Sequence, residues 1–306
     1  MTAPQRHPRT MPNRRAPEAV NALDILRAPN FACVPWLVHG FSTRGGGVST
    51  CYGGRTLNLG FTPDDSKENV ERNRQVLLAA LRATNGKGGL WPLAQLKQIH
   101  SAIVHRVDAA AHKPLAGDGL ITNAPAVLLA IKTADCVPVL VVDLERRAVG
   151  AFHAGWRGTV ARIVEKGVGE MRRRFGSRPH ELRAAIGPSI RRCCYRVGPE
   201  VRAEFESQFA YSAQLFEEIF DANALHVRYP LLFLNQRPPG HGDLGPEIHL
   251  DLVEANRRQL LEAGLRAEEI SIVPGCTACD TTRFFSHRAE LGRTGRMMAV
   301  IGIQPE

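Results

Sequence analysis

Two apolar segments decide the fold of this chain: residues 130–143 read AIKTADCVPVLVVD, and residues 148–159 read AVGAFHAGWRGT. Each contains a short run of valine, alanine and other apolar residues that ends at charged residues or glycine, which is typical of a buried strand. Cys136 and His153 lie beside or within these runs. We therefore expect a thiol and an imidazole close together on neighbouring strands of the core.

The segments on either side alternate between the periods of helices and strands. A 3.6-residue repeat of apolar residues predicts amphipathic helices at about 64–83, 159–175 and 251–263. A further strand is predicted over Pro92–Val107, and it carries His100. Direct and helical connections between strands alternate, so the expected fold class is α/β, a layered α+β arrangement of mixed β-sheets and flanking helices in a single domain.

Two stretches differ in composition from this pattern. Residues 1–22 are rich in proline and arginine and contain no apolar repeat, which predicts a disordered basic extension. Residues 23–306 are expected to form one catalytic domain. Within it, residues 226–247 concentrate proline and glycine, which predicts an irregular insertion or loop.

Composition argues against several classes of protein. The 306 residues are 44% hydrophobic with a formal net charge of +9, but only 6% are aromatic and no basic stripe carries interleaved aromatic residues, so nucleic-acid binding is not expected. No run reaches the ~18 apolar residues of a membrane-spanning helix. The seven cysteines are an odd number without disulfide-like spacing, and the basic N-terminus lacks an apolar signal segment, so the expected location is the cytoplasm.

Three possible metal ligands lie on or at the ends of apolar strands: His100, Cys136 and His153. Their spacing resembles no zinc finger, so the prediction depends on their shared context. Two imidazoles and one thiolate suit tetrahedral zinc with a fourth position left open, as in catalytic sites. Cys136 and His153 could instead form a nucleophile and its base, which needs no second imidazole. The residues alone leave both alternatives open.

Basic and acidic residues near these ligands are candidates for binding a charged ligand. Arg44 precedes three glycines whose backbone N–H groups could cradle an anion, although the loop has no Walker-type continuation. Arg157 could hold an anionic or planar group, or could pair with Asp135. Asp135 could also orient a histidine ligand or assist the base.

The remaining cysteines form two close pairs. Cys276 and Cys279 make a CxxC motif, and Cys193 and Cys194 are adjacent. On a strand, adjacent side chains point to opposite faces, so only one of the second pair could join a metal site. A second metal site is therefore not expected, and neither is a redox CxxC, because no suitable βα context precedes it.

Several motifs together resemble the YfiH-like family, whose members are variously named laccase-domain or multicopper polyphenol oxidase proteins, purine nucleoside phosphorylases and peptidoglycan editing factors. The resemblance extends over about residues 31–303. It is carried, in the family's order, by Arg44–Gly47, Asn58–Gly60, Gln98–His100, Thr133–Pro138, His153–Thr159, Ile186–Ile190, Phe284–Arg288 and Thr294–Arg296.

The resemblance implies a zinc site at His100, Cys136 and His153, with copper as the alternative metal. It implies a pocket for purine nucleosides and phosphate, with phosphorolysis of adenosine, inosine, guanosine and methylthioadenosine and hydrolytic deamination of adenosine. Cys136, His153 and Asp135 are then the catalytic candidates. The candidates for binding substrate or phosphate are Arg44, Arg157 and Asn58. A homodimer is a further possibility that the sequence leaves open.

Two other roles follow from the family's names. Removal of a wrongly incorporated residue from a cell-wall precursor would use the same pocket, and a Cys136–His153 hydrolase or amidase could perform it. Copper-dependent phenol oxidation is disfavoured, because a multicopper oxidase needs a trinuclear cluster with many more histidines, and the eleven histidines here show no paired His-x-His spacing. The sequence does not determine the metal, the preferred nucleoside, the cellular role or the oligomeric state.

Overall fold

The computed structural model describes residues 22–85, 88–109, 113–219 and 246–305. The predicted basic extension lies outside these residues except for its last position. Most of the predicted insertion at 226–247 also lies outside them. The domain boundaries therefore stay predictions.

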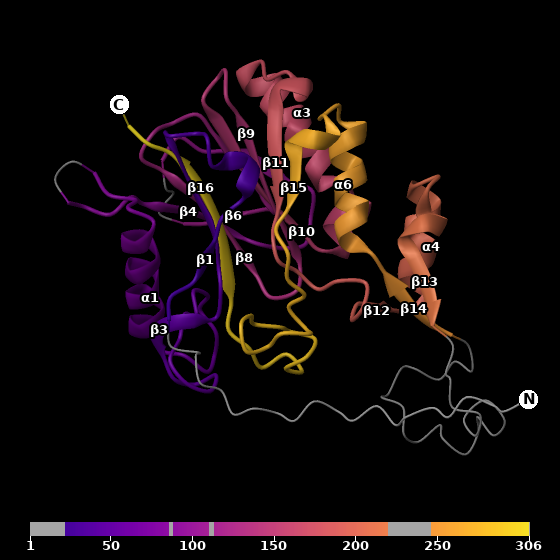
Figure 1. Cartoon of the computed structure of the whole chain (residues 1–306), viewed down its shortest axis with the longest axis horizontal. Helices are drawn as coiled ribbons and strands as arrows, with labels where there is room; N and C mark the ends of the chain where they lie inside the picture. Colours follow the sequence, from indigo (N-terminus) through magenta and orange to yellow (C-terminus); the bar gives the residue numbers. More distant parts are fainter. Residues whose placement is uncertain (1–21, 86–87, 110–112, 220–245, 306) are drawn as a thin grey trace, which may run out of the picture.

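Two mixed β-sheets stack face to face at the centre of the molecule (Figure 1). The first sheet contains, in spatial order, β1 (Ile25–Leu26), β2 (Leu37–Ser42), β16 (Met297–Ile303), β8 (Leu128–Thr133), β4 (Leu93–Lys97) and β6 (Leu115–Ala116). The second contains β15 (Ile270–Ile272), β11 (Leu182–Ile186), β9 (Val137–Asp143), β10 (Ala148–Ala154), β7 (Gly119–Thr122) and β5 (Val104–Arg106). Both sheets combine parallel and antiparallel pairs.

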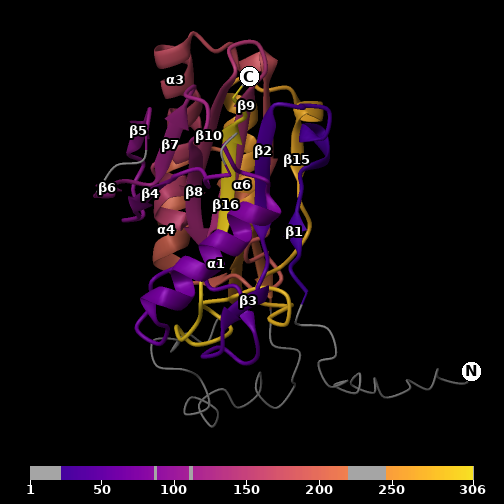
Figure 2. The ribbon, with the colours of Figure 1, turned by 90° about the vertical axis from the view of Figure 1, so that its left-hand side faces the viewer.

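Helices cover the outer faces of both sheets. The principal helices are α1 (Lys67–Ala80), α2 (Trp156–Val160), α3 (Ile163–Phe175), α4 (Pro199–Gln208) and α6 (Leu252–Glu262). Figures 1 and 2 show α1 on the outside of the first sheet, while α3 and α6 cover the second. Short 3-10 helices occur at Pro29–Phe31, Pro179–Glu181, Ser212–Leu215 and Ala267–Glu269. No helix in the described ranges is long and apolar enough to cross a membrane.

This layering explains why the central strands are apolar at nearly every position. In β8, Leu129 and Ile131 pack between the sheets, whereas Leu128 and Ala130 pack with α1 against the outer face. Successive side chains of a strand point to opposite faces, so a strand covered on both sides needs apolar residues throughout. The predicted class of mixed sheets with flanking helices is confirmed.

A small third sheet and a short strand complete the fold. The sheet contains β12 (Arg196–Val197), β14 (Glu247–Leu250) and β13 (Phe216–Ile219), and it lies beside α4 (Figure 1). The strand β3 (Gly45–Ser49) makes isolated bridges to Thr56. It therefore replaces the open glycine loop predicted after Arg44.

The segment predicted as one strand over Pro92–Val107 is divided between the two sheets. β4 belongs to the first sheet and β5 to the second, and the loop between them carries His100. The backbone N–H groups in this loop donate to a buried carboxylate, Asp118, instead of to a neighbouring strand. The prediction of a continuous strand was wrong, because hydrophobic alternation cannot show where a chain crosses between sheets.

Close packing between α3 and β10 supplies a test of this architecture. A Cβ atom at Gly167 would lie 2.3 Å from Cε1 of the buried Phe152 ring, whereas Gly169, two residues along the same helix, faces open space. We expect Gly167→Ala to lower the free energy of unfolding by about 1–3 kcal/mol through overpacking. We expect Gly169→Ala to raise it by up to about 1 kcal/mol, because alanine favours the helix.

Urea unfolding followed by circular dichroism measures both changes. A Gly167→Ala midpoint equal to or above that of the parent would contradict the packing of α3 on β10.

Candidate metal centre

Three side chains from three segments converge at one end of the paired sheets. Cys136 is the last residue of the turn that carries the chain from β8 in the first sheet to β9 in the second, His153 lies near the end of β10, and His100 lies in the loop after β4. Their possible ligand atoms all lie within 4.8 Å of one another. The Cys136 Sγ–His100 Nε2 distance is 3.9 Å, and the two imidazole rings are edge to face at 5.0 Å.

A buried carboxylate, Asp118, organises this group. It is fully buried, and it accepts hydrogen bonds from His153 Nδ1 at 2.8 Å and from Ser101 Oγ at 2.8 Å. It also accepts from the backbone N–H groups of Ile99, His100 and Ser101. One side chain therefore orients one imidazole directly and fixes the loop that carries the other.

Asp118 is one of the candidate site residues that could not be recognised in the sequence. Its only local signal is its position between Gly117 and Gly119 at the start of a buried strand. Because His153 Nδ1 lies against the Asp118 carboxylate, the neutral imidazole carries its proton on Nδ1, and its Nε2 then has a lone pair for a ligand. This is the role predicted for Asp135, and the structure gives it to Asp118.

The charges of this group shift its pKa values in a consistent pattern. Burial alone raises the pKa of Asp118, but hydrogen bonds from His153 and Ser101 lower it to about 2. Burial likewise raises the pKa of Cys136, but the charge of His153 and hydrogen bonds from both histidines lower it to about 6. Burial lowers the pKa of His153, whereas Cys136 and Asp118 raise it to about 9. Without a metal, the group thus favours a thiolate beside an imidazolium.

Backbone strain and close approach are concentrated here. His100 and Asp135 have φ of 58° and 89°, a region that non-glycine residues seldom occupy. A Cβ atom at Gly155 would lie 2.9 Å from His100 Cδ2 and 3.0 Å from Cys136 Sγ. Gly155 has an ordinary extended φ of −71°. Glycine is needed there because the two donor side chains occupy the space beside it. The backbone strain at His100 and Asp135 is typical of functional sites.

The three donors open into a cavity of about 490 Å³. Phe61 and Tyr195 supply aromatic walls. Cationic side chains on its lining are Lys97, Lys132, Arg288 and Arg296. Burial, followed by the charges of Arg74 and Arg296, lowers the pKa of Lys132. This region of positive charge suits an anionic ligand group.

The structure does not bring Arg44 or Asn58 to this cavity. The buried Arg44 guanidinium pairs with Glu290 at 2.7 Å and donates to the Thr281 and Tyr52 carbonyl oxygens. The fully buried Asn58 donates to Asp65 and accepts from two backbone N–H groups. Both predicted ligand-binding residues therefore join loops to one another, and their polar atoms are engaged within the protein.

The predicted pairing of Asp135 with Arg157 is not formed. Asp135 lines the cavity, but its carboxylate accepts from Thr277 Oγ1, Ser286 Oγ and the Arg288 backbone N–H at 2.6–2.7 Å. Arg157 is exposed, and its guanidinium stacks over the Trp156 ring at 4.3 Å. Asp135 thus anchors the segment after β15, whereas Arg157 lies outside the cavity lining.

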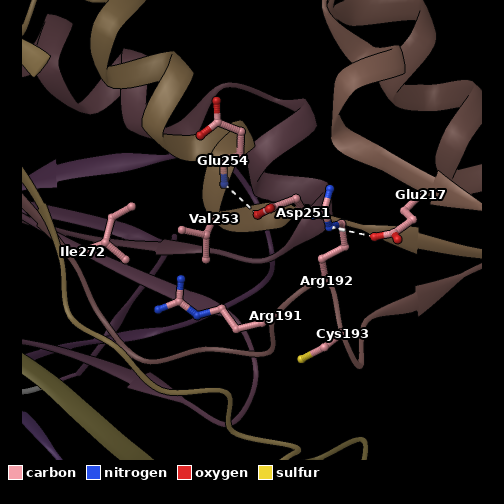
Figure 3. A pocket seen from close by; sticks show the side chains of 8 residues that line it. All are labelled: Arg191, Arg192, Cys193, Glu217, Asp251, Val253, Glu254 and Ile272. Atoms are coloured by element: carbon pink, nitrogen blue, oxygen red, sulfur yellow. Dashed lines mark hydrogen bonds and ion pairs between the residues drawn. The ribbon is translucent and has the colours of Figure 1, made fainter.

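A second cleft of about 420 Å³ lies between the turn after β11 and the start of α6 (Figure 3). Its charges are mostly engaged: Arg192 pairs with Glu217 at 3.1 Å, and Asp251 accepts the Glu254 backbone N–H at the start of α6. Arg191 donates to two backbone carbonyl oxygens. This cleft does not contain the convergent donors of the first cavity.

Comparisons with known proteins agree on one family. A family model described as multi-copper polyphenol oxidoreductase laccase matches residues 38–304. A protein of Deinococcus radiodurans named purine nucleoside phosphorylase is 40% identical, with 92% of this chain and 93% of that protein covered. A protein of an unknown prokaryotic organism named adenosine deaminase RL5 is 36% identical, with 56% of each covered. The crystal structure of a Bacillus licheniformis hypothetical protein YfiH is 33% identical, with a TM-score of 0.74 and coverage of 88% of this chain and 93% of that one.

The lowered pKa of Cys136 predicts its reactivity in chelator-treated protein. Because the pKa is about 6, the thiolate persists above that pH and is lost as the pH falls through it. We expect the rate at which iodoacetamide alkylates Cys136, measured by peptide mass spectrometry, to reach half of its maximum near pH 6. His153→Ala should move this midpoint upward by about one unit or more. A midpoint near 9 in both proteins would contradict the thiolate–imidazolium pair.

The Asp118 contacts predict a second effect. Asp118→Asn keeps the shape of the side chain but removes its negative charge. It also replaces one carboxylate oxygen by an amide NH2 group, which cannot accept from the backbone N–H groups. We expect the zinc affinity of the His100–Cys136–His153 site in this variant, measured by competition with a chromophoric chelator, to fall about 10–100-fold. The matched control is Asp143→Asn, because Asp143 is also fully buried and accepts backbone N–H groups but does not line the cavity. Equal zinc affinity in the two variants would exclude the orienting role of Asp118.

Proposed function

The chain belongs to the YfiH-like family, which the laccase model describes, and from this premise we propose that it is a zinc-dependent purine nucleoside phosphorylase that also deaminates adenosine. Phosphorolysis would convert adenosine and phosphate into adenine and ribose 1-phosphate. Deamination would convert adenosine and water into inosine and ammonia. Inosine, guanosine and methylthioadenosine are the further proposed substrates of phosphorolysis.

The observation that carries this proposal is the convergence of His100, Cys136 and His153, with Asp118 behind His153, on a cavity. Two imidazoles and a thiolate are the donors that zinc prefers, and three protein ligands leave one position open, as in catalytic zinc sites. Because Gly155 has no side chain, both His100 and Cys136 have room beside it. Zinc in such a site supplies a Lewis acid and brings the pKa of water toward neutrality.

The cavity suits a nucleoside together with an anion. Its volume of about 490 Å³ falls within the range of small-molecule sites. Phe61 and Tyr195 offer aromatic faces for a purine ring. Lys132 and Arg296 are our candidates for the phosphate oxygens, in place of Arg44 and Asn58.

The protein side chains have separate tasks in this proposal. Asp118 holds the proton of His153 on Nδ1 and so keeps Nε2 available. Asp135 keeps the Arg288 backbone against the cavity and is thus a positioning residue. The cations hold phosphate beside the ribose C1′ atom, where its oxygen forms the new bond as the C1′–N9 bond breaks and the base leaves.

A cysteine hydrolase or amidase that uses Cys136 and His153, including one that edits cell-wall precursors, is the second candidate. The lowered pKa of Cys136 favours it, because a thiolate is the active nucleophile. The presence of His100 Nε2 at 3.9 Å from the same sulfur favours the metal instead. Copper-dependent phenol oxidation has less support, because the metal-capable clusters in the described ranges contain only the two histidines of this site.

Chromatography of adenosine incubated with enzyme, with and without phosphate, tests the proposal. We expect phosphate-dependent release of adenine, and inosine formation that needs no phosphate. Lys132→Ala should raise KM for phosphate about tenfold or more and change deamination much less, because it removes a cation from the proposed anion position. Lys166→Ala, on the exposed face of α3, is the matched control.

Failure to form adenine or inosine at micromolar enzyme would overturn the nucleoside proposal. His100→Ala separates the two candidates: it should abolish activity if zinc is required. Full activity in that variant, with complete loss on alkylation of Cys136, would favour the cysteine hydrolase.

A further inference from the structure

We propose that Cys193, Cys194, Cys276 and Cys279 bind a second zinc ion, which has a structural role and joins two loops behind the cavity. The sequence alone did not predict this site. Its ligands come from the turn after β11 and from the segment after β15, and none of them belongs to the His100–Cys136–His153 group.

The four sulfur atoms lie close enough together to share one zinc ion. The Sγ atoms of all four cysteines lie within 4.8 Å of one another. Cys193 lies 3.6 Å from Cys276 and 3.4 Å from Cys279, and Cys194 lies 3.2 Å from Cys279. Zinc–sulfur bonds of about 2.3 Å in a tetrahedron place the sulfur atoms roughly 3.8 Å apart. A disulfide needs about 2.05 Å, and all four cysteines are free.

The expectation that adjacent cysteines point apart was wrong, because they do not lie on a strand. Residues 192–194 form a turn, in which the backbone N–H of Cys194 donates to the Arg191 carbonyl oxygen at 2.9 Å. Cys276 and Cys279 frame a second turn, closed by the Asp280 N–H on the Cys276 carbonyl oxygen. In turns the alternation of a strand is lost, so both members of each pair can face one point.

The contacts of Arg191 stabilise the Cys276 thiolate and hold the two turns together. The Arg191 backbone N–H donates to Cys276 Sγ at 3.4 Å, a contact that stabilises a metal-bound thiolate. The Arg191 guanidinium donates to the Val273 and Gly275 carbonyl oxygens. Its positive charge would lie beside a zinc–thiolate group of net charge −2. Figure 3 shows Arg191 and Cys193 side by side at the edge of the second cleft.

The location indicates a structural role. Four protein ligands leave no open position, which distinguishes this cluster from the open site in the cavity. The turn after β11 continues directly into Tyr195, which lines the cavity. The segment after β15 carries Thr277, whose hydroxyl donates to Asp135. Zinc bound by the four cysteines would therefore fix two parts of the cavity wall relative to each other.

Metal analysis by inductively coupled plasma mass spectrometry on the purified full-length protein tests this proposal. Relative to the parent, we expect Cys279→Ser and Cys193→Ser each to lose about one zinc per chain. His100→Ala should lose the other ion and keep this one, so failure of the cavity zinc would leave the present proposal intact. Cys33→Ser is the matched control, because Cys33 is an exposed free cysteine outside both clusters.

Cobalt substitution provides a second measurement in case a variant folds poorly. Cobalt-loaded His100→Ala should show the intense thiolate charge-transfer and tetrahedral d–d absorption of a four-sulfur site. Unchanged zinc content in both folded cysteine variants would overturn the proposal. Peptide mass spectrometry of protein alkylated before digestion would also overturn it if the four cysteines were found as disulfides.

Discussion

The geometry of the candidate metal centre depends on the burial of the Asp118 carboxylate. A buried charge is costly unless it is paired and hydrogen-bonded, and Asp118 meets this condition by accepting from His153, from the Ser101 hydroxyl and from three backbone N–H groups. Removal of any donor would leave part of that cost uncompensated. The carboxylate therefore fixes both the tautomer of His153 and the unusual backbone of His100, and these two features decide which nitrogen atoms face the cavity.

The stacked sheets provide the frame that brings these residues together. Apolar packing covers both faces of the central strands, and two of the three donors, Cys136 and His100, lie where the chain passes from one sheet to the other. The β8–β9 turn places Cys136 at this end, and the β4–β5 loop places His100 opposite. Sites built on the ends of packed strands keep a more constant geometry than sites on free loops. The strain at Asp135 is maintained by three hydrogen bonds from the segment after β15.

The same segment connects the cavity with the cysteine cluster. Thr277 lies between Cys276 and Cys279 and donates to Asp135, while Tyr195 directly follows Cys194 and lines the cavity. The two proposed metals would thus have complementary tasks, one open to ligands and one closed by four thiolates. Loss of the structural ion would therefore change the cavity through Thr277 and Tyr195, which adjoin the cysteines in the sequence, without direct contact between the two metal positions.

The amino-acid sequence predicted the layered fold, the buried strands around Cys136 and His153, and the three candidate metal ligands. These follow from hydrophobic periodicity and residue chemistry, which are local properties of the chain. Only the tertiary structure decided that Asp118 supports His153 from 35 positions away, that Arg44 and Asn58 are engaged between loops, and that the four cysteines meet. The partner of a buried polar group depends on which distant segments fold together, and no local pattern records that meeting.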